Sequence, residues 1–206
     1  MNVSVIIPCR NNFKYFLQAY NSVRKHYPNI EIVALDDAST DDTWEQFNKL
    51  YDQDEDLVIY RNDSTERVGH TVLYDMGIDF ASRDIVTILH SDMIVTPNYL
   101  QNMIKHLEKG VVVSGTRIEP PLHPPGPEKY VQNFGMEPEE FDDSAFQQFV
   151  KEAEIANQNK TTQGIFAPWM IYKEDFVSIG GHDKLFAPME LEDSDIFNRM
   201  LLAGYK

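Results

Sequence analysis

The chain has 206 residues, of which 42% are hydrophobic, and this is enough for one domain with a packed core. Its 33 acidic residues against 18 lysines and arginines give a formal net charge of −15, which disfavours non-specific binding to nucleic acid or to an anionic membrane. A single cysteine, Cys9, excludes an internal disulfide. No apolar run approaches the ~18 residues of a membrane helix, and the amino terminus lacks a basic signal segment, so we expect a cytoplasmic protein without a transmembrane segment.

Strand and helix patterns alternate over the first 115 residues. The predicted elements, in chain order, are a strand at 3–8, a helix from Phe13 through Val23, a strand at 30–37, a helix opened by an Asp42/Glu45 capping box, a strand at 57–60, a helix at 69–81, a strand at 84–89, a helix at 97–108 and a strand at 111–115. Such alternation predicts an α/β fold with a doubly wound, mainly parallel sheet.

The alternation stops at about residue 119. The proline-rich stretch 119–130 predicts a loop or an extended flap, because proline removes backbone donors from helices and sheets. A helix-prone stretch follows at 142–157, and the β-like run 164–172 returns the chain to the sheet. We interpret this insert as the variable part of the domain, where a second substrate is recognised.

Acidic residues gather where predicted strands end. Asp36 and Asp37 follow the second strand, Asp92 follows the strand at 84–89, and Glu192, Asp193 and Asp195 open the last helix. A single aspartate in such a place is most often a turn or cap residue. Three clusters at equivalent strand ends indicate a cleft for a hard divalent metal and a phosphate ligand.

Five segments, in this order, resemble the successive motifs of the family 2 glycosyltransferases of the GT-A fold: VSVIIPCRNN, EIVALDDASTDDT, VGHTVLYDMGIDFAS, IVTILHSDM and LEDSDIFNRMLLAGYK. The resemblance covers nearly the whole chain except about 119–163. It implies one GT-A domain over 1–206, with a nucleotide-sugar half at 1–115 and an acceptor half at 116–206 that carries the insert at 119–163. It also implies inverting, metal-dependent transfer of a sugar from a nucleotide diphosphate to an acceptor hydroxyl or amine on a glycan, a lipid-linked carrier or a protein.

Matched to the family motifs, Pro8, Arg10, Asp37 and Gly69 would line the nucleotide. A carboxylate at Asp37 can accept the imide N–H of uracil, which favours UDP. The helix after Gly69 departs from the family pattern, since Tyr74 stands where arginine is usual and Asp75 where asparagine is usual.

The triplet His90-Ser91-Asp92 aligns with the family's Asp-x-Asp motif. His90 replaces the first acid, so Asp92 keeps the role of metal ligand, while His90 and Ser91 are assigned to the nucleotide side. The resemblance implies Mn²⁺ or Mg²⁺, and a direct imidazole bond to the metal would favour Mn²⁺.

The pair Glu192-Asp193 matches the acidic pair that supplies the catalytic base in this family. We assign the base to Asp193 and positioning of the acceptor to Glu192. Trp169 is assigned to the acceptor wall, where it would stack on a sugar ring or, equally, belong to the core. His182 stands where the family commonly has an aromatic residue.

Two other functions compete with this interpretation. A nucleotidyltransferase would need a glycine-rich basic loop after the first strand, and PCRNNFKYF has none. An inactive glycosyltransferase-like binding or scaffolding module fits the departures at Tyr74, Asp75 and His90. Family members commonly continue past the last helix, so we expect the sequence to be a fragment or a short form.

Overall fold

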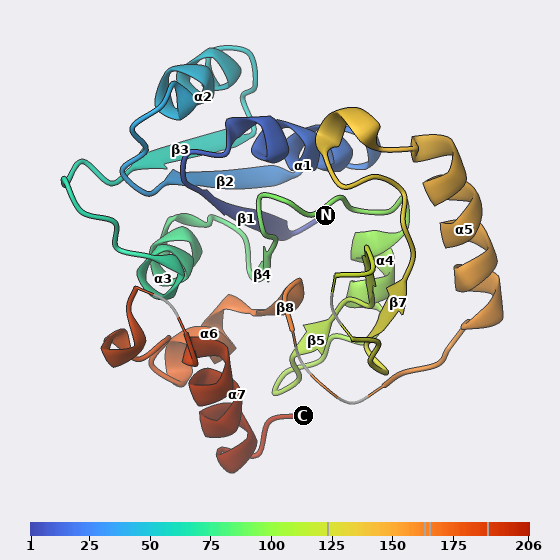
Figure 1. Ribbon diagram of the computed structural model, residues 1–206. Coiled ribbons are helices and arrows are strands. Elements are labelled where there is room, and N and C mark those ends of the chain that lie inside the picture. Colours follow the sequence, from blue (N-terminus) through green and yellow to red (C-terminus); the bar gives the residue numbers. More distant parts are fainter. Residues whose placement is uncertain (123, 163, 165, 189) are drawn as a thin grey trace.

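The computed structural model of the chain describes residues 1–122, 124–162, 164, 166–188 and 190–206 (Figure 1). The strands are β1 (Val3–Cys9), β2 (Glu31–Asp36), β3 (Leu57–Arg61), β4 (Ile85–Ile88), β5 (Val113–Ser114), β6 (Arg117–Glu119), β7 (Lys129–Val131) and β8 (Trp169–Tyr172). The helices are α1 (Phe13–His26), α2 (Thr43–Tyr51), α3 (His70–Phe80), α4 (Tyr99–Ile104), α5 (Asp143–Ala156), α6 (Lys173–Ser178) and α7 (Glu192–Leu202), with short 3₁₀ turns η1 (Pro138–Glu140) and η2 (Lys184–Phe186).

Six strands form one sheet in the order β3-β2-β1-β4-β8-β5. The four strands from β1 to β4 are parallel, whereas β8 runs antiparallel to both β4 and β5. The predicted α/β fold with a mainly parallel sheet is therefore confirmed. The chain reaches β8 through the long insert and not through a short helical crossover, and this connection leaves β8 able to run in the opposite direction.

Helices cover both faces of the sheet (Figure 1). On β1, Val5 and Ile7 pack with α1, α2 and α4, while Ile6 between them packs with α3, α6 and α7. Because side chains alternate across a strand, each buried strand contributes to two cores. The carboxyl ends of the parallel strands are therefore held firmly between two layers.

Four predicted elements differ from the observed ones, and the first of them is the β-like run predicted at 164–172, which is shortened to β8 among the described residues. The capping box is wrong: Asp42 precedes α2, but its side chain caps no backbone N–H and instead accepts a bond from Gln46 at 2.8 Å. The helix predicted at 97–108 is shortened to α4, and the strand predicted at 111–115 is shortened to β5. In contrast, α5 matches its prediction, and Asp142 caps it by accepting a bond from the Ala145 N–H at 3.0 Å.

Polar contacts attach the insert to the rest of the molecule. Lys14 on α1 pairs with Glu137 at 2.8 Å, and Lys25 on the same helix pairs with Asp143 at 3.0 Å. Asn98 donates to Glu154 on α5 at 2.9 Å. Residues 123, 163 and 165 of the predicted insert and following strand lie outside the described residues. Among the described helices, none is both long and apolar enough to cross a bilayer.

The packing of α3 on the sheet gives a test of the fold. A Cβ added at Gly77 would lie 2.4 Å from Ile6 Cγ2 and 3.0 Å from Leu35 Cδ1, so Gly77→Ala forces α3 away from β1 and β2. We expect the free energy of unfolding to fall by about 1–3 kcal/mol in a denaturant titration. Lys151→Ala, at an exposed position of α5, is the control and should change it by less than about 0.5 kcal/mol. Equal stability of the two variants would contradict the close packing.

Candidate active site

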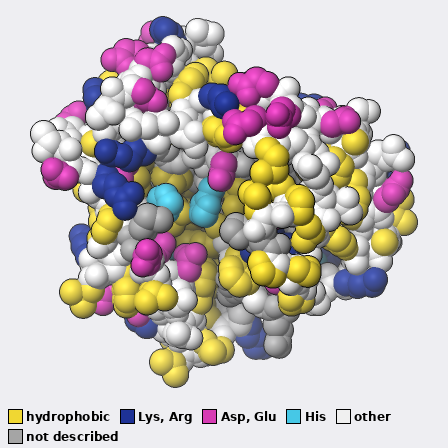
Figure 2. Space-filling model, viewed as in Figure 1, with side chains coloured by type: hydrophobic (Ala, Val, Ile, Leu, Met, Phe, Trp, Pro, Cys, Tyr) yellow, Lys and Arg dark blue, Asp and Glu magenta, His cyan; other side chains and the backbone are white. Residues whose placement is uncertain are grey.

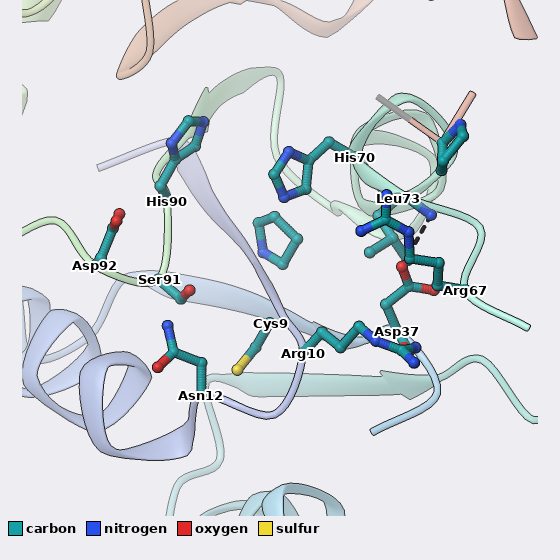
Figure 3. Close-up of a pocket in the computed structure, with 13 residues that line it drawn as sticks. Cys9, Arg10, Asn12, Asp37, Arg67, His70, Leu73, His90, Ser91 and Asp92 are labelled. Atoms are coloured by element: carbon teal, nitrogen blue, oxygen red, sulfur yellow. Dashed lines mark hydrogen bonds between the residues drawn. The ribbon is translucent and has the colours of Figure 1, made fainter. Parts of the chain in front are cut away.

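A pocket of about 230 Å³ opens at the carboxyl ends of β1, β2 and β4, beside the first turn of α3. The seven residues assigned from sequence to the nucleotide and the metal all line it: Pro8, Arg10, Asp37, Gly69, His90, Ser91 and Asp92. In Figure 3, Arg10, Arg67 and Asp37 lie at one end of the pocket, and Ser91 and Asp92 lie at the other. The pocket thus has two arginines and an aspartate at one end and a second aspartate at the other, which suits an extended ligand with groups of different charge.

Asp37 holds the loop that leads into α3. Its carboxylate accepts bonds from Asn62 Nδ2 at 3.0 Å, from the Val68 N–H at 2.8 Å and from the Gly69 N–H at 2.9 Å. An ionised carboxylate has about four acceptor positions, so these three donors leave about one for a ligand. Arg10 donates to the Asp37 and Ala38 carbonyl oxygens and is thereby fixed at the same end of the pocket.

His90 is fixed by α3. The Tyr74 hydroxyl lies 2.8 Å from His90 Nε2, and the two rings are nearly parallel at 7°. His70 stacks on the His90 ring with the centroids 5.7 Å apart. Burial lowers the pKa of His90, against the opposing charge of Asp92, so the ring is neutral at neutral pH. Of the two ring nitrogens expected to reach a ribose hydroxyl, Nε2 is already bonded, and Nδ1 remains for a ligand.

Asp92 is exposed at the pocket mouth and makes no hydrogen bond or ion pair within the described part of the chain. Among the described residues, no group of three or more His, Cys, Asp or Glu side chains is arranged to hold a metal ion. One free carboxylate does fit a divalent metal whose other ligands are phosphate oxygens and water, because Mg²⁺ is often bound in that way.

The acidic pair Glu192-Asp193 forms the first turn of α7. Glu192 is buried, and its Oε2 has no hydrogen-bond partner among the described residues. The Oδ1 atom of half-buried Asp193 is likewise enclosed without a described partner. Burial raises the pKa of Asp193, and the neighbouring Glu192 charge raises it further, whereas His182 and His70 lower it. Burial chiefly, with the charges of Asp193, Glu192 and Asp92, also raises the pKa of Tyr74 well above its usual range. Glu192 and Asp193 are not among the residues that line the pocket.

The sequence and the fold of this chain are similar to those of known proteins. The sequence pattern of the family described as Glycosyl transferase family 2 matches residues 4–174. The chain belongs to this family. The expected family is therefore confirmed, over a region that covers the first four quoted motifs from Ser4 onward, while the fifth, at 191–206, lies beyond the match.

Relatives of the chain are glycosyltransferases of greater length. It is 30% identical over 108 residues to glycosyltransferase GlyG of Streptococcus pneumoniae, a match that covers 52% of this chain and 35% of GlyG. Its fold is similar to the mannosyltransferase PcManGT from Pyrobaculum calidifontis in complex with GDP-Man and Mn²⁺, with a TM-score of 0.67 and 21% identity over 100% of this chain and 53% of the other. It is also similar to GalNAc-T7 with UDP, GalNAc and Mn²⁺, with a TM-score of 0.72 and 15% identity over 99% of this chain and 41% of the other. The chain therefore has the GT-A fold and spans about a third of the curated relative's length.

The position of Trp169 bears on the role that the family resemblance implied for it. Trp169 lies on β8 with 0% exposure, packed against Phe176 and Phe197, so its ring offers no surface for a sugar. Of the two interpretations given for this residue, its position favours the core.

Sequence reasoning missed pocket residues on the amino-terminal turns of two helices. His70, Asn12 and Leu73 line the pocket, but none of them stands at a strand end or in a quoted acidic cluster. The signal for His70 was its place directly after Gly69, because the first turn of a helix with a glycine cap faces the ligand side. Figure 2 shows histidine side chains at the centre of the hollow face, with basic and acidic side chains around them.

The pKa of Asp193 gives a test that needs no substrate. Ionisation of Asp193 is less favourable in the folded protein than in the unfolded chain, so its contribution to stability is lost as the pH rises through the unfolded and then the folded pKa. Asp193→Asn removes this loss, and we expect Tm at neutral pH to rise by about 2–4 °C. The gain should vanish in acid, where the carboxyl is protonated in both states.

Asp195→Asn is the matched control on the same helix. Asp195 pairs with Arg199 at 2.8 Å, so its neutralisation should lower Tm or leave it unchanged. A gain in Tm that is equal for both variants, or that persists in acid, would show that burial of Asp193 is not its cause.

Proposed function

We propose that this chain is an inverting glycosyltransferase that moves a sugar from a nucleotide diphosphate, with UDP favoured, to a hydroxyl or amine of an acceptor. The observation that supports it most is that one pocket gathers Asp37, Arg10 and the His90-Ser91-Asp92 turn from three neighbouring strand ends. The proposed base Asp193 stands on the first turn of α7, outside the residues that line this pocket, and its charge, like that of Asp92, raises the pKa of Tyr74.

The donor nucleotide would lie along the pocket, with its base near Asp37 and its diphosphate near Asp92. The remaining acceptor position of Asp37 suits a ring N–H, which uracil supplies. Guanine also carries a ring N–H, and PcManGT binds GDP-Man, so GDP is the second nucleotide to test.

A divalent metal would be held by Asp92 together with oxygen atoms of the diphosphate. When bound, it supplies positive charge that stabilises the leaving diphosphate. Arg10 and Arg67 supply the cationic side chains of the pocket, at its opposite end. In a chain with a net charge of −15, these cations and the metal would offset the repulsion of an anionic donor.

Asp193 would act as the general base. The acceptor oxygen or nitrogen forms a bond to the sugar's anomeric carbon while the bond from that carbon to the diphosphate oxygen breaks. Its proton passes to the Asp193 carboxylate, and the nucleoside diphosphate leaves with the electron pair. A raised pKa brings the carboxylate closer to neutral pH, where a general base is most effective.

Nucleotide binding tests this proposal before any acceptor is known. We expect Tm of the purified protein to rise with UDP only when Mn²⁺ is present, compared with GDP, CMP and dTDP. At a ligand concentration about 100 times Kd, the stabilisation is about 2.7 kcal/mol, on the order of 5–10 °C in Tm. Asp92→Ala should abolish the metal-dependent part of the shift, and Asp52→Ala, an exposed aspartate at the end of α2, should keep it.

The other possible outcomes of this nucleotide-binding experiment distinguish the donor, the metal role and the reaction class. A shift with GDP and not UDP would correct the donor and keep the reaction class. A shift of equal size without metal, or retained in Asp92→Ala, would contradict the metal role of Asp92. No shift with any of the nucleotides would favour the inactive binding module.

A further inference from the structure

Three ring side chains, those of Tyr74, His90 and His70, stack against one another beside the pocket. The rings of Tyr74 and His90 are nearly parallel at 7°, and the centroid of the His70 ring lies 5.5 Å from that of Tyr74 and 5.7 Å from that of His90. His70 and His90 line the pocket (Figure 3), whereas Tyr74 is buried with the core residues of its face of the sheet. The stack holds the imidazole of His90 in one orientation, so its two nitrogens have fixed surroundings.

The Tyr74 hydroxyl determines which nitrogen of His90 carries a proton when the ring is neutral. It lies 2.8 Å from His90 Nε2, and among the described residues it has no other hydrogen-bond partner. A phenol that accepted a bond from an Nε2–H would leave its own buried O–H without an acceptor, which is unfavourable. The O–H therefore donates to Nε2, and a neutral imidazole whose Nε2 accepts a bond has its proton on Nδ1.

The proton on Nδ1 does not depend on the charge of the His90 ring. A protonated imidazole has an N–H at both nitrogens, so Nδ1 is a hydrogen-bond donor in that state as well. A nitrogen that binds a metal ion must first lose its proton. The contact between Tyr74 and His90 thus disfavours a metal at Nδ1, and in the neutral ring the electron pair of Nε2 is already used by the Tyr74 O–H.

The free nitrogen of His90 faces its own turn. Nδ1 is bonded to Cγ, so it is the ring nitrogen nearer to the turn of residues 90–92, and it makes no hydrogen bond with any described residue. Asp92 is in the same turn and lines the same pocket. Diphosphate oxygens only accept hydrogen bonds, so they suit an N–H beside Asp92, whereas a second carboxylate at position 90 would repel them.

We propose that His90 donates from Nδ1–H to a phosphate oxygen of the nucleotide donor, that it is not a ligand of the metal, and that Tyr74 is the positioning residue that keeps the proton on Nδ1. These roles rest on the proposed function, because they require a nucleotide diphosphate in the pocket. The departures from the family resemblance at Tyr74 and His90 then have one chemical effect. A hydrogen-bond acceptor is replaced by a donor, and the metal is held by Asp92 and phosphate oxygens.

The position of the proton can be tested without any ligand by ¹⁵N NMR of the imidazole side chains, with the His90 signals assigned by their loss in His90→Asn. We expect a protonated Nδ1 and an unprotonated Nε2 when the ring is neutral. Tyr74→Phe removes the O–H that fixes this state, so the two nitrogen signals should move toward each other. Tyr51→Phe, at an exposed position of α2, is the matched control and should leave both signals in place. A His90 ring with its proton on Nε2 in the wild-type protein would overturn the proposal.

The phosphate contact is tested by comparing UDP with uridine, which has the base and the ribose but no phosphate. In the presence of Mn²⁺, we expect His90→Phe to weaken UDP binding by about ten- to a hundredfold and to leave competition by uridine unchanged. His90→Asn, whose amide can donate from a place close to Nδ1, should recover part of the affinity for UDP. An equal loss for uridine would place the bond on the nucleoside and overturn the phosphate contact.

The metal role is tested by the Mn²⁺ concentration that gives half-maximal binding of UDP. His90→Asn should leave this concentration nearly unchanged, whereas Asp92→Ala should remove the dependence on Mn²⁺. Loss of that dependence in both variants would show that His90 binds the metal and would overturn the proposal. Failure of the wild-type protein to bind any nucleotide would refute the proposed function and the phosphate contact together, whereas a proton on Nε2 in a protein that binds UDP would refute only the role of Tyr74 and His90.

Discussion

The hydrogen bonds from Val68 and Gly69 to the Asp37 carboxylate determine where the rest of the pocket lies. They tie the end of β2 to the start of α3, and α3 then carries His70, Tyr74 and Asp75 to their places. Gly69 is confined from the other side as well, since a Cβ there would lie 1.7 Å from the Pro188 carbonyl oxygen. One residue thus joins the nucleotide side of the pocket to the loop that precedes α7.

The departures from the family pattern occur in contacting pairs. Tyr74 replaces the usual arginine and His90 the usual aspartate, and these two side chains are bonded to each other. Asp75 and His182 are the second such pair. Each of these residues that departs from the resemblance therefore has a hydrogen-bonding partner that departs from it as well.

Much of the site could be predicted because strand ends are visible in sequence. Short β-rich runs followed by Pro8, Asp37 and Asp92 fix three corners of the pocket, and parallel strands bring their carboxyl ends together. The reversed direction of β8 could not be predicted, because an apolar run carries no sign of its direction. Trp169 was ambiguous for a similar reason: an aromatic residue on a strand has the same pattern in a core as at a binding surface. His70 was missed although its place directly after Gly69, at the start of α3, was visible in the sequence.

The insert is joined to α1 by a different kind of contact from those inside the sheet. The pairs Lys14–Glu137 and Lys25–Asp143 join side chains that are about half exposed. Such pairs contribute little each and weaken as salt screens them, whereas the two apolar cores do not depend on ionic strength in that way. At higher ionic strength these pairs therefore contribute less to the attachment of the insert on α1. The attachment of the insert to α1 is thus more sensitive to salt than the packing of the sheet between its two cores.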